Sequence, residues 1–314
     1  MSEHSPPPKH RFTWPQALRL FVTLALLGVI LAAIPLDQAW QAMGRVNLLW
    51  LAIALAWTFL LRATFALRWH LLLAPAGVRH SYLHTLVIAL IGMFYDNFAP
   101  ANLGGDMARS YLAADGHSAK VVDVAASVVA DRTLGLISLV LLGFASSALL
   151  GVPQLRLALW VLLGTGVAGL SLAWILARRT VGETSRSPLR RVADKLSELS
   201  RALLRYRQHR VRLTGALLLS CLGICVGGVA LSCWSRAFGF DLKLTQAVAI
   251  VVISSVVAMI PITINGLGLT DGAAILLLGW AGMGRPEALA QMMLQRIAVI
   301  ALSLLGAGLQ FLRR

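Results

Sequence analysis

Long uninterrupted apolar runs are the feature that most limits what this chain can fold into. Residues 17–34, 158–177 and 288–312 are each long enough to cross about 30 Å of hydrocarbon as α-helices. Only 13% of the residues are charged, whereas a soluble domain carries about 25%. The alternating strands of about ten residues that a membrane β-barrel needs do not occur. The sequence therefore predicts an all-α polytopic membrane protein.

Nine apolar segments are predicted to enter the membrane. They are 17–34, 48–67, 82–98, 121–150, 157–177, 213–235, 244–261, 268–283 and 288–312. Eight of the nine tryptophans lie near the ends of these segments, where membrane proteins place aromatic side chains, and only Trp57 lies in the middle of one. The first segment is too long for the apolar core of a cleaved signal peptide, so we expect a retained span with IPLDQAW as its exit loop.

Basic residues set the orientation of the chain, whose net charge is +15. Residues 178–212 hold eleven Lys and Arg against three acidic residues, which places this segment and both termini in the cytoplasm. Apolar residues recur there at helical spacing, at Leu189, Val192, Leu196, Leu199, Leu203 and Tyr206. We expect an amphipathic helix on anionic lipid headgroups, with a solvated connector helix as the alternative. Nucleic acid is not an expected partner, because no binding module accompanies the basic residues.

This orientation predicts two re-entrant hairpins. Residues 82–120 must enter and leave on the cytoplasmic side, and their returning arm, about 101–113, is too short and polar for an ordinary span. The sequence NFAPANLGGDMAR (97–109) would form the hairpin tip. Residues 244–283 must likewise start and end outside, with IPITINGLGLTDG (260–272) at their centre. Interrupted segments at matching positions of two inverted halves indicate the substrate site of a transporter.

The predicted organisation has eight membrane elements, six spans and two re-entrant hairpins, arranged as an inverted repeat. Residues 1–16 would form a cytoplasmic tail and 17–150 the first membrane repeat. Residues 151–177 and 213–312 would form the second repeat, with 178–212 as the basic amphipathic cytoplasmic loop between its two parts.

The first hairpin tip carries residues suited to an anion. Pro100 would break the incoming helix, and Gly104 and Gly105 would allow tight backbone geometry. A helix starting near Asp106 presents unpaired N–H groups and a positive dipole end. Arg109 would lie on the same face and could hold a phosphate through two hydrogen bonds. The alternative is a turn outside the membrane with Asp106 as a helix N-cap.

The second tip repeats this pattern loosely. Pro261, Asn265, Gly266, Gly268 and Asp271 are rough counterparts of Pro100, Asn102, Gly104, Gly105 and Asp106. Gly266 and Gly268 lie near a second expected helix start, with Asp271 in its first turn. A purely structural first-turn charge is an equally good interpretation of Asp271.

Charged residues within the apolar segments are candidates for function. One polar stripe is spaced by four residues, at Asp123, Ser127 and Asp131. Arg132 could face the anion site while Asp131 pairs with Arg109 or Arg296, although a buried pair that locks helices together is the alternative. Arg296 is a second lone cation, nine residues into the last predicted span. Arg62 and Arg68 are expected to extend toward the inner membrane surface.

Signatures of catalysis and metal binding are absent from the sequence. It contains no P-loop, no His-Glu-x-x-His and no serine elbow, so we expect neither an enzyme nor a cofactor. Cys221, Cys225 and Cys233 lack the further ligands of a metal site and are expected to be buried thiols. Any transport would run downhill or on an ion gradient.

Three motifs resemble the signatures of a known family. NFAPANLGGDMARSYL, VVADRTLGLISL and IPITINGLGLTDGA are similar to those of the flippase-like membrane family named for the transmembrane domain of lysylphosphatidylglycerol synthase. The resemblance covers about 15–312. It implies a bacterial inner-membrane protein that moves a polar or charged, sometimes glycan-linked, lipid between leaflets. The implied important positions are Asn97, Pro100, Gly104, Gly105, Asp106, Arg109, Asp131, Arg132 and the loop 261–271.

The chain departs from the family pattern at two acids. Asp131 and Asp271 stand where the family usually has glutamate, one methylene longer. The chain also lacks a soluble synthase domain, so it is not expected to aminoacylate lipid itself.

We therefore predict a lipid translocator in which the headgroup phosphate meets the hairpin helix starts and nearby arginines. The predicted substrate-binding residues are Asn97, Pro100, Asn102, Gly104, Gly105, Asp106, Arg109, Asp131, Arg132, Asn265, Gly266, Gly268, Asp271 and Arg296. One alternative is a secondary transporter of a small soluble anion. The other is a non-transporting membrane subunit that supports a partner enzyme, a glycosyltransferase or lipid synthase.

Overall fold

The computed structural model describes residues 14–98, 104–115, 120–150, 160, 202–203, 205–258, 263 and 266–312. These residues form α-helices and two short 3-10 helices, and they contain no strand. The α-helices are α1 (Trp14–Ala33), α2 (Leu36–Gly44), α3 (Leu48–Leu73), α4 (Tyr82–Phe98), α5 (Gly104–Ala114), α6 (Val121–Leu150), α9 (Arg210–Ala237), α10 (Leu244–Ala258), α11 (Leu269–Trp280) and α12 (Arg285–Leu312). The 3-10 helices are η1 (Ala74–Ala76) and η2 (Tyr206–Gln208).

Four of the described helices are long and apolar enough to cross a membrane. They cover Leu48–Ala76, Val121–Ala148, Arg210–Ala237 and Arg285–Gln310. A fifth span results if α1 and α2 are counted as one, although the chain bends by 80° between them. These helices confirm the prediction of an all-α membrane protein with several spans. The predicted span 157–177 and most of the basic loop 178–212 lie outside the described residues.

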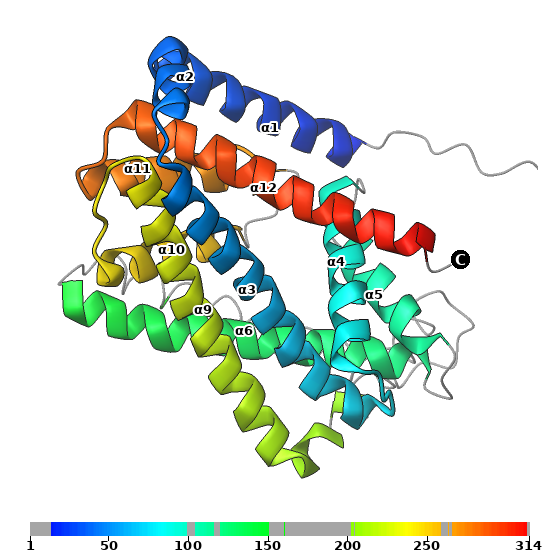
Figure 1. Cartoon of the computed structure of the whole chain (residues 1–314). Helices are drawn as coiled ribbons and strands as arrows, with labels where there is room; N and C mark the ends of the chain where they lie inside the picture. Colours follow the sequence, from blue (N-terminus) through cyan, green and yellow to red (C-terminus); the bar gives the residue numbers. More distant parts are fainter. Residues whose placement is uncertain are drawn as a thin grey trace, which may run out of the picture.

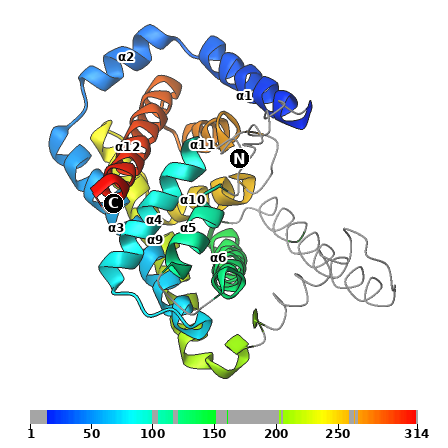
Figure 2. The ribbon, with the colours of Figure 1, turned by 90° about the vertical axis from the view of Figure 1, so that its right-hand side faces the viewer.

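The predicted exit loop IPLDQAW is wrong, because most of it belongs to helix α2. Pro35 precedes the helix with φ −66°, a value that its ring fixes, and Asp37 places a negative charge in the first turn. In Figure 2, α1 and α2 run along one edge of the molecule, where α1 packs on α11 and α2 packs on α12.

Helices α3 and α9 form an antiparallel pair at the centre of the fold (Figure 1). At one end, the Asn47 N–H donates to the carbonyl of Ala237 at 2.9 Å. At the other end, the Tyr206 hydroxyl donates to the carbonyl of Leu72 at 2.7 Å. Between the ends, glycines of α9 face side chains of α3, so the two helices can approach closely. The pair is therefore fastened at both ends and tightly packed between them.

Each central helix carries a fully buried tryptophan near its C-terminal end. Trp69 of α3 donates through its indole N–H to Ser127 Oγ at 3.0 Å. Trp234 of α9 donates in the same way to Thr58 Oγ1 at 3.1 Å. A buried indole N–H needs such an acceptor, and each bond joins its helix to a neighbour. Of the three cysteines, only Cys233 is buried; Cys225 is exposed, so the prediction of three buried thiols is wrong.

Two helical hairpins pack against the central pair. Helix α4 packs on α5, and α10 packs on α11. At 1.5 Å per residue, α5 with 11 residues and α11 with 12 are each only about 17 Å long, too short to cross the hydrocarbon. Helix α4 also packs on α12, while α10 packs on α6. The order long helix, short hairpin, long helix thus occurs twice, in α3–α6 and in α9–α12.

Candidate functional site

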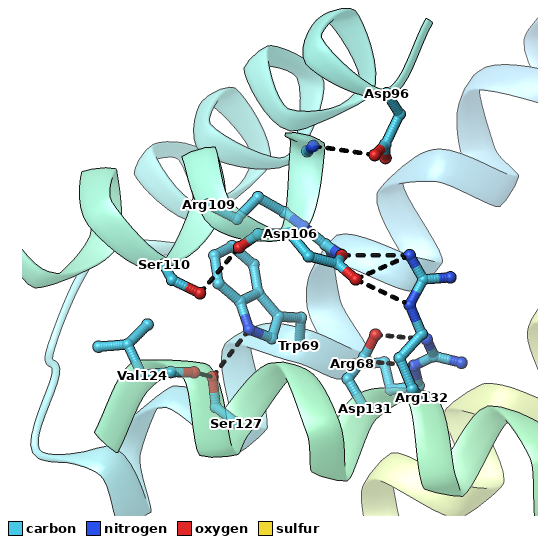
Figure 3. A network of polar contacts seen from close by, with 11 residues as sticks. Arg68, Trp69, Asp96, Asp106, Arg109, Ser110, Val124, Ser127, Asp131 and Arg132 are labelled. Atoms are coloured by element: carbon cyan, nitrogen blue, oxygen red, sulfur yellow. Dashed lines mark hydrogen bonds and ion pairs between the residues drawn. The ribbon is translucent and has the colours of Figure 1, made fainter. Parts of the chain in front are cut away.

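A cavity of about 640 Å³ lies between α3, α4, α6, α9 and α10, beside the first hairpin. Most of its lining is apolar, from α4, α6 and α9. The charged side chains in the lining are four arginines and two aspartates, namely Arg62, Arg68, Arg109, Arg132, Asp96 and Asp131. Figure 3 shows most of these residues and the network that joins them. Charge inside a bundle of apolar helices is costly, so this cavity is the candidate site.

Asp106, the third residue of α5, holds two of these arginines. Arg109 lies one turn along the same helix, on the face that the sequence predicts, and makes an ion pair with this carboxylate. Arg132 of α6 donates to the same carboxylate at 3.1 Å and 3.3 Å. Arg109 lies over the indole of Trp69, 5.2 Å from the ring centroid, whereas the Arg132 side chain is 60% exposed. One carboxylate therefore pairs with two arginines, and Arg132 is the more exposed of the two.

Asp96 occupies the start of helix α5. Its carboxylate accepts the N–H of Gly105 at 2.9 Å, which ties the end of α4 to the beginning of α5. A Cβ at Gly105 would overlap that carboxylate, so the contact requires glycine. The helix start that we expected to be open to a substrate anion is thus met by an acid of the chain itself. Asp96 is not among the predicted site residues, although it is a lone acid in an apolar segment.

Asp131 pairs with Arg68, and the predicted partners Arg109 and Arg296 are wrong. Arg68 Nε and Nη2 donate to the two carboxylate oxygens at 2.6 Å and 2.7 Å, and its Nη1 donates to Ser220 Oγ at 2.9 Å. Both residues are buried, with 9% and 3% exposure, so Arg68 does not extend toward the membrane surface. Adjacent residues on a helix point apart, which directs Asp131 to α3 and Arg132 to α5. The pair joins α3, α6 and α9.

Each residue of the polar stripe of α6 contacts a partner on another segment. Asp123 accepts from Arg205 at 2.6 Å, at the end of the basic segment. Ser127 accepts the indole N–H of Trp69, one turn before Asp131. The spacing by four predicted one face, and the structure directs that face to the C-terminal half of α3 and to the residues that lead into α9.

Asp271 is the third residue of α11 and stabilises the start of that helix. It accepts the N–H of Gly268 at 3.1 Å, and both of its oxygens lie 2.7 Å from Arg296 Nη2. Gly266 and Gly268 have φ of 71° and 79°, a region that suits glycine. Arg296 is therefore a paired residue, and the prediction of a lone cation is wrong. Neither Asp271 nor Arg296 lines the cavity.

The two hairpins carry the same ion pair at the same helical positions. Asp106 is the third residue of α5 and meets Arg132, the twelfth residue of α6. Asp271 is the third residue of α11 and meets Arg296, the twelfth residue of α12. The two ion pairs therefore occupy equivalent positions in their helices.

The remaining predicted residues are described only in part. Pro100, Asn102, Pro261 and Asn265 lie outside the described residues. Asn97 is partly buried near the end of α4. Arg62, which we expected to extend to the membrane surface, instead lines the cavity from the middle of α3, so that expectation is wrong.

Comparison with known proteins bears on this architecture. The sequence profile of the lysylphosphatidylglycerol synthase TM region matches residues 16–306. The chain belongs to this family. The resemblance predicted from the three motifs is thereby confirmed over nearly the whole chain.

The family includes relatives that match at low identity. A UPF0104 membrane protein of Methanothermobacter thermautotrophicus is 24% identical over 306 residues, which cover 90% of each chain. A UPF0104 membrane protein of Archaeoglobus fulgidus is 24% identical over 282 residues, 80% of this chain and 83% of the relative. Together with the long apolar helices, these matches show a multi-pass membrane protein.

Proposed function

We propose that this chain binds an anionic lipid headgroup in the cavity and moves the lipid between the two leaflets of the cytoplasmic membrane. The observation that carries the proposal is the lining of the cavity, in which four arginines stand against two aspartates among apolar helices. Charged side chains at this depth are expensive and usually mark the path of a polar substrate. Translocation needs no chemical step, metal or cofactor.

The charge balance favours a substrate with negative charge. Arg68 and Asp131 neutralise one another. Asp106, just behind the lining, is shared by Arg109 and Arg132. With Asp106 included, the described residues place four arginines against three aspartates, which leaves one positive charge. A phosphodiester headgroup, which carries one negative charge, would balance the site.

The arrangement of the lining also suits a lipid. Leu86, Leu90 and Met93 of α4 and Leu136 and Leu139 of α6 give the cavity an apolar wall beside the arginines. A headgroup would meet the cations while an acyl chain lies against the leucines. In this proposal, Arg132 approaches the phosphate first, because it is the most exposed of the paired arginines.

Alternating access would arise from two inverted halves. Two observations support this arrangement: the antiparallel pair of α3 and α9, and the repeated Asp–Arg pair in the two hairpins. The hairpins would re-enter the membrane from opposite sides, and both termini would lie in the cytoplasm. Rocking of the halves would then expose the headgroup to each leaflet in turn.

Leaflet exchange in reconstituted vesicles tests the proposal. The purified chain is placed in liposomes with a fluorescent phosphatidylglycerol or phosphatidylcholine, and a quencher that cannot cross the membrane reports the lipid that reaches the outer leaflet. We expect faster exchange of phosphatidylglycerol than in vesicles without protein, reduced several-fold by Arg132→Gln. Arg236→Gln removes a cation at the exposed end of α9 and serves as the matched control.

Two results would contradict the proposal. One is exchange at the rate of empty vesicles for both lipids. The other is equal exchange by the wild type and Arg132→Gln at equal incorporation. Release of glycerol phosphate from loaded vesicles without lipid exchange would favour a transporter of soluble anions instead.

A further inference from the structure

Arg62 lies at the centre of the fold, where α3 crosses α9. It is the fifteenth of the 26 residues of α3, about 21 Å along a helix that rises 1.5 Å per residue. Its neighbour Leu61 faces Gly227 of α9, and Phe65, one turn on, faces Gly223. The side chain therefore lines the cavity near the middle of a membrane-spanning helix, beside glycines of α9 that face α3.

Arg62 differs from the other arginines of the cavity because it has no carboxylate partner among the described residues. Arg68 pairs with Asp131, while Arg109 and Arg132 share Asp106. The Nε atom of Arg62 is shielded from solvent and has no hydrogen-bond partner in the part of the chain that the structure describes. Its terminal nitrogens make no hydrogen bond to the described residues either, and Arg62 lines the cavity.

Charged residues beside both hairpins act on Arg62. Asp96, near the end of α4, attracts the Arg62 guanidinium. Arg296 of α12, which pairs with Asp271, repels it. The carboxylate of Asp96 is already engaged by the Gly105 N–H, so it does not form an ion pair with Arg62. A guanidinium at this depth without an acid is unfavourable unless water or an anion satisfies it.

Arg62 has no basic counterpart at the interval that separates two other pairs of like residues. Trp234 follows Trp69 by 165 residues, and Asp271 follows Asp106 by the same interval. The same step from Arg62 leads to Gly227, which has no side chain. The position of α9 at this interval therefore supplies no matching cation.

We propose that Arg62 is the direct ligand of the substrate's phosphate at the middle of the membrane, an assignment that rests on the proposed function of the cavity. A guanidinium presents two parallel N–H donors to two phosphate oxygens, a geometry that lysine does not reproduce. Arg132 would receive the headgroup at the exposed side of α6, and Arg62 would hold its negative charge at mid-depth. The ligand chemistry is a phosphate ester with one negative charge.

Binding to the purified full-length protein in detergent tests the assignment. The probes are short-chain phosphatidylglycerol, short-chain phosphatidylcholine and glycerol phosphate, compared for the wild type, Arg62→Gln, Arg62→Lys and Arg236→Gln. We expect Arg62→Gln to weaken phosphatidylglycerol binding at least tenfold, Arg62→Lys to weaken it less, and Arg236→Gln to leave it unchanged. Glycerol phosphate separates the two sources of the phosphate, since a lipid site binds it weakly and a site for soluble esters binds it as well as the lipid.

Thermal unfolding of the same variants separates a binding role from a structural one. Arg62 makes no ion pair in the described structure, so Arg62→Gln should melt at or above the temperature of the wild type. A clearly lower melting temperature, or phosphatidylglycerol binding equal to that of the wild type, overturns the assignment. Binding that depends on Arg62 without lipid exchange in vesicles would support the anion site and contradict the translocation proposal. Lipid exchange that Arg62→Gln leaves unchanged would support translocation and contradict the assignment of Arg62.

Discussion

Arg68 and Asp131 are joined by two hydrogen bonds of 2.6 Å and 2.7 Å, and both side chains are buried between α3, α6 and α9. The arginine is also satisfied by Ser220, so little of its donor capacity is left for a substrate. Although this pair borders the cavity, its geometry is that of a structural contact that holds three helices together.

Removing one partner of this pair should strongly destabilise the protein. Asp131→Asn or Arg68→Gln leaves the other charge buried without compensation, and we expect a loss of about 3–5 kcal/mol in the free energy of unfolding. The double variant should lose less than the sum of the two single losses. Unfolding in mixed micelles measures these values. The exposed pair of Arg236 and Asp241 is the control, since Arg236→Gln should cost at most about 1 kcal/mol.

Gly105→Ala should disturb the first hairpin. The added methyl group would overlap the carboxylate of Asp96, which must then move away from the Gly105 N–H. Overpacking of this kind costs about 1–3 kcal/mol, and a lower melting temperature would show it. Gly279→Ala is a matched control in helix α11, because a Cβ there meets open space. Equal melting temperatures for the two variants would contradict the described contact.

Asp106→Asn should strengthen the binding of anions to the cavity. The substitution removes the carboxylate that Arg109 and Arg132 share, so the site gains one unit of positive charge. We expect the affinity for short-chain phosphatidylglycerol to rise about three- to tenfold, since 1.4 kcal/mol corresponds to a factor of ten. Asp241→Asn makes the same chemical change on an exposed residue outside the cavity. Unchanged or weaker binding by Asp106→Asn would argue against a phosphate site here.

Tyr206 should make the stability of the protein depend on alkaline pH. Burial raises the pKa of its phenol above the ordinary value of 10.0, and the neutral hydroxyl donates to Leu72. Because the folded state favours the protonated form, this contribution is complete below about pH 10 and is lost as the pH rises toward the higher pKa of the folded state. The melting temperature between pH 8 and pH 11.5 should fall less for Tyr206→Phe than for the wild type.

A control variant distinguishes this effect from general alkaline denaturation. Tyr111 is an exposed residue of α5, and Tyr111→Phe should retain the pH dependence of the wild type. Tyr206→Phe also loses one buried hydrogen bond, so we expect it to be less stable at neutral pH by about 1 kcal/mol. Parallel curves for all three proteins would show that Tyr206 does not titrate with unfolding.

The positions of the helices could be predicted from the sequence because the apolar runs are long and their ends are marked. The predicted segments 121–150 and 288–312 agree with α6 and α12 within three residues. Helix α5 lies within a few residues of the predicted arm 101–113. The position of α2 was not predicted, because its polar residues are typical of a loop. Its packing against α12 is not evident from the sequence.

The partners of the charged residues could be predicted only in part. The contact of Asp106 with Arg109 is local, since residues three apart lie on the same face of any helix. The contact of Asp131 with Arg68 depends on how α6 is rotated relative to α3, which spacing along one helix does not determine. For the same reason, spacing along α4 does not indicate that Asp96 accepts the Gly105 N–H of α5.

The two ends of the α3–α9 pair restrict how the molecule can move. A slide of one helix along the other would break the Asn47–Ala237 bond at one end and the Tyr206–Leu72 bond at the other. The α3–α9 pair is therefore suited to act as a fixed axis of rotation. We expect the two halves to rock about this pair without sliding along it, and a crosslink between α3 and α9 should leave that motion intact.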